Sequence, residues 1–175
     1  MLPESDQPEQ PRILIVGMGN RYRRDDGVGP VVAGRFEQES GDSVQVVHEP
    51  ADPMRLIDLW RDRQLVIIID AARSGEKPGT ILRFELLRSP LPEEIFPSYS
   101  THTMGLTKTI ELARTLDRLP RRLVVYGIEA QNLDSGEGLS VEVEAAVPRV
   151  VCEITADLTR NPGHVERMPS CMSPR

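Results

Sequence analysis

Apolar residues follow two patterns along this chain, short runs and positions spaced three or four residues apart. Short apolar runs bounded by turn residues are typical of strands, whereas the wider spacing is typical of helices with one buried face. The two patterns alternate from one end of the sequence to the other. The runs predict strands at residues 12–16, 43–48, 65–70, 79–86 and 122–130, and the wider spacing predicts helices at 28–40, 52–62, 104–116 and 140–158.

Strands separated by helices of this length predict an α/β fold. We expect a three-layer αβα sandwich with a mostly parallel, twisted sheet of about five strands. The run at 65–70 is apolar until its last residue, which predicts a central strand, whereas the alternating segment at 79–86 follows a tight turn and predicts an edge strand.

Local signals refine two of the predicted helices. Asp52 is expected to be the N-cap of the helix at 52–62, with Pro53 in its first turn. Pro148 is expected to start or kink part of the last helix, because proline cannot donate the backbone hydrogen bond that a helix interior needs.

The chain length fits a single domain, predicted over residues 12–158. Residues 1–11 are polar and rich in proline, which predicts a disordered N-terminal lead, and residues 159–175 lack a core pattern, which predicts a flexible tail. No secretory signal is recognisable, and no apolar run approaches the roughly 20 residues that span a bilayer. Cys152 and Cys171 form no CxxC pair, so we expect a reduced, cytoplasmic setting.

The formal net charge of −6 argues against a nucleic-acid partner, because such binding depends on clustered Lys and Arg. Short basic groups at residues 21–24 and 121–122 are interpreted as solvated faces.

The loop "GMGNRYRRDDGVGP" at residues 17–30 follows the first strand and resembles a dinucleotide-binding turn. That fingerprint needs glycine or alanine where this chain has Tyr22, and Asp25 and Asp26 would repel a pyrophosphate at the helix start. We therefore expect the loop to let the backbone pass close to another kind of bound partner, with Gly17, Gly19 and Asn20 as candidate substrate contacts.

Ligands of parallel α/β folds bind beyond the carboxyl ends of the strands. Asp26 precedes a predicted helix there, Asp70 ends the central strand, and His102 precedes another helix, so the three can converge. Two carboxylates and one imidazole suit a first-row divalent metal. Each residue also has an ordinary alternative: either aspartate can cap a helix, and His102 can be a helix-start residue with its ring bonded to backbone.

Four segments in the same order and spacing resemble the nickel–iron hydrogenase maturation proteases: "ILIVGMGNRYRRDDGVGP", "LVIIIDAARSGEKPGTILRF", "STHTMGLTKTIELARTLDRLPRRLVVYGIEA" and "GLSVEVEAAVPRVV". The resemblance implies a three-layer α/β endopeptidase that removes the C-terminal extension of a hydrogenase large-subunit precursor after nickel insertion. The family's metal-contacting residues fall on Asp26, Asp70 and His102. On this view the nickel is supplied by the substrate, and the enzyme needs no permanent metal.

The sequence contains no defensible Ser-His-Asp order, no HExxH helix and no placed catalytic cysteine. Attack by water is therefore expected, as in an aspartic-type endopeptidase, with Asp26 or Asp70 as the base. Two other functions stay open at this point: a metal-sensing chaperone that binds the precursor without cutting it, and a small nucleotide-binding regulatory module.

Two positions depart from the family pattern. The segment "HEPADPMRL", which begins at His48, replaces a glycine-rich Asp-Gly-Gly-Thr segment of many relatives, and it is the segment in which partner choice is expected to differ. We interpret His48 as an exposed strand-end residue rather than a ligand. Asp26 stands where glutamate is common, which shortens the side chain and keeps its chemistry.

Overall fold

The structure, a computed structural model, describes residues 12–37, 44–48, 52–86, 90–92, 94–96 and 105–160. Its strands and helices follow the predicted order, and each predicted element is present within a few residues of its expected limits. The strands are β1 (Ile13–Gly17), β2 (Val44–His48), β3 (Leu65–Ala72), β4 (Ile81–Glu85) and β5 (Leu123–Glu129). The helices are the 3-10 helix η1 (Arg24–Gly27), α1 (Val28–Glu37), α2 (Pro53–Trp60), α3 (Leu106–Thr115) and α4 (Val141–Thr159).

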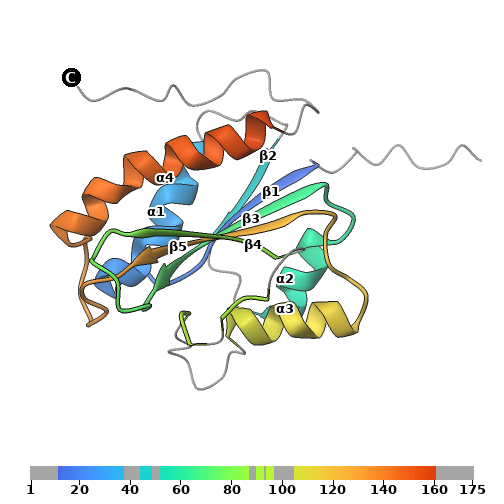
Figure 1. The fold of residues 1–175 in the computed structure, drawn as a ribbon, viewed down its shortest axis with the longest axis horizontal. Helices are drawn as coiled ribbons and strands as arrows, with labels where there is room; N and C mark the ends of the chain where they lie inside the picture. The colour runs from blue at the N-terminus through green and yellow to red at the C-terminus, as the bar shows by residue number, and fades with distance from the viewer. Residues whose placement is uncertain are drawn as a thin grey trace, which may run out of the picture.

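The five strands form one sheet in the order β2-β1-β3-β5-β4. Only β4 is antiparallel to its neighbour, β5. Helices α1 and α4 lie on one face of the sheet and α2 and α3 on the other (Figure 1), and each face contributes to its own buried apolar cluster. This confirms the predicted three-layer α/β fold, with β3 in the centre and β4 at an edge.

The local signals in the helices have different outcomes. Asp52 caps α2 as predicted, because its side chain accepts a hydrogen bond from the Met54 N–H at 2.9 Å and Pro53 follows it. Helix α4 begins at Val141 and continues to Thr159 with Pro148 inside it, so Pro148 does not start a helix. The Pro148 side chain is exposed, so its ring displaces no core residue.

Two glycines allow α1 to approach the sheet very closely. A Cβ atom on Gly29 would lie 2.2 Å from the Met18 carbonyl oxygen and 2.4 Å from that of Ile69. A Cβ atom on Gly17 would lie 2.6 Å from the Gly29 carbonyl oxygen. The Met18 N–H also donates to the Ile69 carbonyl at 2.8 Å. The first turn of α1 therefore rests directly on the carboxyl ends of β1 and β3.

A buried ion network fixes the end of α4 to β4 and β5. Asp157 is 1% exposed and accepts hydrogen bonds from Arg83, Arg122 and the Tyr126 hydroxyl. Burial acts to raise the pKa of Asp157, but the bonds from Arg83 and Tyr126 outweigh it and hold that pKa below its usual range. Arg122 also pairs with Glu85 at 2.8 Å, so interpreting this arginine as part of a solvated face was wrong.

The described part of the chain contains no helix with the length and apolar character of a membrane span. Cys152 is disulfide-bonded in the structure, which disagrees with the reduced thiols expected from the sequence. The cytoplasmic setting therefore stays a prediction.

The close approach of α1 predicts a large difference between two glycine substitutions in that helix. We expect Gly29→Ala to lower the free energy of unfolding by about 3 kcal/mol or more, because the added methyl group meets backbone that cannot move aside. Gly34→Ala is the matched control: its Cβ has no neighbour closer than 3.9 Å. Alanine is also favoured in a helix, so stability should stay equal or rise by about 0.5–1 kcal/mol. Urea denaturation measures both, and equal effects would contradict the packing argument.

Candidate functional site

Asp70 lies where β3 extends past the end of β1. The last residue of β1, Gly17, pairs with Ile69, so Asp70 is the first β3 residue without a β1 partner. The strand does not end there, as the sequence suggested, because Asp70 continues to pair with Gly127 of β5 and the pairing runs on to Ala72. Asp70 is therefore held by β5 on one side and faces the loop after β1 on the other.

The Asp70 side chain points to the sheet face that α2 and α3 cover. Side chains alternate along a strand, and Ile68 and Ala72, on the same face as Asp70, belong to the apolar cluster on that side. The Asp70 carboxylate accepts a hydrogen bond from the Ala71 N–H at 2.8 Å. The residue is half-buried.

Asp26 is positioned by the loop that follows β1. Gly19 has a φ of +105°, and a Cβ there would lie 1.9 Å from the Asp26 carbonyl oxygen. The Asn20 N–H donates to the Asp26 carboxylate at 2.9 Å, while the Asn20 side chain accepts from the Tyr22 N–H at 2.8 Å. Gly19 and Asn20 thus determine the backbone conformation around Asp26. Gly17 has a different role, because the lack of a side chain there allows α1 to pack against β1. Their contact with a substrate stays a prediction.

Asp26 and Asp70 lie close enough for the charge of Asp26 to affect the pKa of Asp70. The pKa of Asp70 rises to about 8, mainly because burial disfavours its charged form and secondly because the negative charge of Asp26 is close, with the Ala71 N–H acting in the opposite direction. A divalent cation would relieve the repulsion between these two carboxylates, and carboxylate oxygens are suitable ligands for it. The pair therefore fits the predicted metal contact.

The third predicted ligand, His102, lies outside the described residues, so the structure does not test its place beside the two aspartates. Within the described part of the chain, no group of three His, Cys, Asp or Glu side chains could hold a metal ion. The pair Asp26 and Asp70 is consequently the part of the predicted site that the structure brings together.

Asp25 has a separate role that the sequence analysis missed. It is fully buried, and its carboxylate accepts hydrogen bonds from the backbone N–H groups of Gln131, Asn132 and Ser140 at 2.9, 2.8 and 2.6 Å, and from the Ser140 hydroxyl at 3.0 Å. These bonds tie η1 to the loop between β5 and α4. In a 3-10 helix neighbouring side chains point about 120° apart, so two adjacent aspartates cannot both face the same crevice. The direct adjacency of the two aspartates before a helix is the feature of the sequence that indicates different roles for them.

His48 lies at the end of β2, as expected, and its Nε2 is 2.8 Å from the Glu37 carboxylate of α1. The side chain is 25% exposed, so it is more buried than the sequence suggested. Its partner is on the α1 side of the sheet, whereas Asp70 points to the α2 and α3 side. The replacement segment "HEPADPMRL" thus begins with a residue engaged in a structural contact; residues 49–51 lie outside the described part of the chain.

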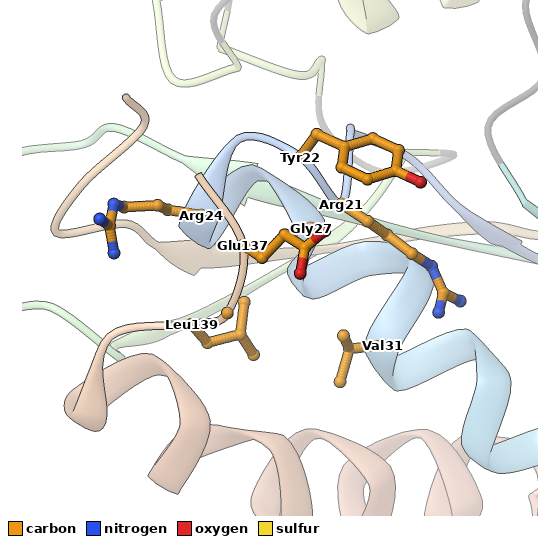
Figure 2. A pocket seen from close by; sticks show the side chains of 8 residues that line it. Arg21, Tyr22, Arg24, Gly27, Val31, Glu137 and Leu139 are labelled. Atoms are coloured by element: carbon orange, nitrogen blue, oxygen red, sulfur yellow. The ribbon is translucent and has the colours of Figure 1, made fainter. Parts of the chain in front are cut away.

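A cavity of about 290 Å³ lies between the loop after β1 and the loop before α4 (Figure 2). Val31 and Leu139 line its apolar part, and Glu137 lies between Arg21 and Arg24, whose side chains point in opposite directions. Neither Asp26 nor Asp70 lines this cavity.

Comparison with known proteins identifies the family. The model of the family HycI, hydrogenase maturation protease, matches residues 31–157. The chain belongs to the hydrogenase maturation protease family. Among the relatives of this protease, the hydrogenase 2 maturation protease of Escherichia coli (strain K12) is 30% identical over 163 residues, which cover 90% of this chain and 96% of the relative.

Solved structures agree with that assignment. The hydrogenase maturating endopeptidase HybD from E. coli superposes with a TM-score of 0.77 and 27% identity over 93% of this chain and 99% of that one. The NiFe hydrogenase maturation protease HybD from Thermococcus kodakarensis gives a TM-score of 0.61 and 26% identity over 84% of this chain and 98% of that one. The protein is thus a hydrogenase maturation endopeptidase, as the resemblance predicted.

The same substitution at the two neighbouring aspartates is predicted to affect stability to different extents. We expect Asp25→Asn to lower the free energy of unfolding by about 2 kcal/mol or more, because an amide group cannot accept all four hydrogen bonds and turns a donor toward buried N–H groups. Asp26→Asn keeps an oxygen for the Asn20 N–H and should change stability by less than about 1 kcal/mol. Chemical denaturation of both proteins provides the measurement. Similar losses would show that Asp25 does not anchor the loops.

The raised pKa of Asp70 predicts how stability changes with pH in the metal-free protein. The folded state retains a proton that the unfolded chain loses near pH 3.8, so ionising Asp70 destabilises the fold as pH rises towards the folded pKa of about 8. Between about pH 5 and pH 8 the wild type should lose on the order of 4 kcal/mol, about 1.4 kcal/mol per pH unit, that Asp70→Asn does not lose. Denaturation in the presence of a chelator tests this, and parallel pH curves for the two proteins would contradict it.

Proposed function

We propose that this protease removes the C-terminal extension of a nickel–iron hydrogenase large-subunit precursor after nickel has been inserted. The observation that carries the proposal is the pair Asp26 and Asp70, two mutually repelling carboxylates held at the carboxyl edge of the sheet. The T. kodakarensis relative, which is named a NiFe hydrogenase maturation protease, supports the class of substrate.

In this proposal the nickel arrives as part of the substrate. Asp26 and Asp70 contribute carboxylate oxygens, and His102 contributes an imidazole nitrogen. This set contains no thiolate and leaves coordination positions open, so it complements a metal that the precursor already holds through its own cysteines. Bound nickel supplies a shared point of attachment that orients the precursor. A precursor without nickel lacks that attachment.

Cleavage itself is assigned to water. Asp26 or Asp70 accepts a proton from the attacking water, and the leaving amine takes up a proton as the peptide bond breaks. The loop of Gly19 and Asn20 holds Asp26 in place, and β5 holds Asp70, so both carboxylates are presented without rearrangement of the backbone. Such preorganisation is what a positioned general base requires.

The alternative is a maturation factor of the same fold that senses nickel in the precursor without cutting it. Both functions need Asp26 and Asp70 for binding, but only the protease shortens the precursor. The cytoplasmic location expected from the sequence is retained as a prediction in either case.

We expect purified protein to shorten nickel-loaded precursor and to leave metal-free precursor intact, as measured by intact mass. The chelator in the assay should be too weak to strip the loaded form. Asp70→Asn should lower the cleavage rate by at least about 100-fold, the usual scale for losing a positioned acid–base group, while the protein stays folded.

Each other outcome has a distinct meaning. Equal cleavage of both precursors would remove the nickel checkpoint and leave the peptidase in place. Binding of loaded precursor without any change in its mass would support the chaperone alternative. A variant Asp70→Asn with full activity would exclude Asp70 from the site.

A further inference from the structure

A second cavity, of about 510 Å³, opens at the carboxyl edge of the sheet. Three segments far apart in sequence form its walls: η1, the residue that follows β3, and the loop between β5 and α4. Arg24 lines it from the first segment and Arg73 from the second, with Asn132, Asp134 and Ser140 on the third. Arg73 is three residues after Asp70, so the cavity belongs to the same edge of the sheet as the proposed active site.

Hydrogen bonds that do not involve the guanidinium groups of Arg24 and Arg73 hold the walls of this cavity in place. Asp25 binds the N–H groups of Asn132 and Ser140, and the Arg23 side chain donates to the Leu133 carbonyl at 3.1 Å. By contrast, the side chains of Arg24 and Arg73 make no hydrogen bond or ion pair in the described part of the chain. Both residues are exposed.

Arg24 is held in place by its backbone. It has a φ of +46°, a left-handed conformation that costs a side-chain-bearing residue about 1 kcal/mol or more. Its N–H donates to the Gly136 carbonyl at 2.8 Å. A Cβ on Gly136 would lie 3.1 Å from the Arg24 Nε, so the missing side chain of Gly136 makes room for the guanidinium. Strain of this kind is retained where the surroundings fix one conformation.

The charge of the cavity is opposite to that of the whole protein. Two arginines and one acidic residue, Asp134, line it, in a chain with a net charge of −6. Guanidinium groups bind carboxylates through paired, charge-assisted hydrogen bonds. A peptide substrate that ends near this edge offers such groups as acidic side chains or as its own C-terminal carboxylate.

We infer that the cavity between Arg24 and Arg73 is a substrate subsite that binds a carboxylate of the precursor's C-terminal extension. The inference rests on the proposed function and adds the residues that recognise the segment to be removed. Arg24 and Arg73 are assigned to binding and orientation of the extension, whereas the proton transfer stays with the aspartates.

The test uses Arg24→Asn, Arg73→Gln and the double variant of the full chain. Asparagine tolerates the positive φ of residue 24, so Arg24→Asn removes the guanidinium without new backbone strain. Arg35→Gln, which changes an exposed arginine of α1 outside the cavity, is the matched control. With nickel-loaded precursor we expect KM to rise about tenfold for each single variant and further for the double variant, with kcat nearly unchanged. The control should behave as the wild type.

A binding assay identifies the carboxylate. A fluorescent synthetic peptide with the sequence of the extension is titrated with each protein, in its native form, with an amidated C-terminus, and with its acidic side chains replaced by amides. Loss of affinity in the amidated peptide assigns the terminal carboxylate, and loss in the other assigns an acidic side chain. The modified peptide that loses affinity should no longer distinguish wild type from the double variant.

Failure of this inference is distinguishable from failure of the proposed function. Normal cleavage with an unchanged KM in the folded double variant, or absence of peptide binding to wild type, would overturn the subsite and leave the protease function standing. If wild type does not cleave nickel-loaded precursor, the proposed function fails, and the peptide titrations still decide whether the cavity binds a carboxylate.

Discussion

The site depends on one steric constraint, the direct contact between the first turn of α1 and the backbone at the carboxyl ends of β1 and β3. Gly17 and Gly29 make this contact possible because neither has a Cβ atom, and any side chain there would meet carbonyl groups within 2.6 Å or less. The contact fixes η1 at the end of the sheet, and η1 carries Asp26. Since β3 extends past β1 at this same place, Asp70 comes beside Asp26. The packing of Gly17 against Gly29 thus places the carboxylate of Asp26 close to that of Asp70.

The adjacent residues Asp25 and Asp26 of η1 have different roles, the first in stability and the second in the proposed function. Asp25 is a buried carboxyl group that accepts four hydrogen bonds, which compensate for its lost hydration, and it joins η1 to the loop between β5 and α4. Asp26 accepts a hydrogen bond from Asn20 and lies close to Asp70, whose pKa is raised first by burial and second by the negative charge of Asp26. Unfavourable charge pairs of this kind are characteristic of sites that act on a ligand, because the ligand relieves the repulsion.

The sequence was sufficient to predict the strands, the helices and the three-layer fold, because continuous and spaced apolar positions report directly on burial. It also indicated Asp26 and Asp70, since residues after parallel strands meet at one edge. It was not sufficient to predict that β3 continues to Ala72, because that depends on its register with β5. Nor did it reveal the partners of Asp25, which lie more than 100 residues away. Arg122 was misinterpreted for the same reason: its acidic partners come from β4 and α4.

The two proposed contacts with the precursor strengthen each other, so specificity depends on both being made at once. A nickel ion shared with Asp26 and Asp70 and a carboxylate held by Arg24 and Arg73 are two points on one peptide, so binding at the first raises the effective concentration of the second. The orientation of the peptide relative to the water-activating carboxylate requires both, because a single attachment leaves it free to rotate. A precursor that lacks nickel and a nickel protein that lacks the extension would each retain only one attachment. Both contacts lie at the same edge of the sheet. Together they select the precursor that contains nickel and still has its C-terminal extension.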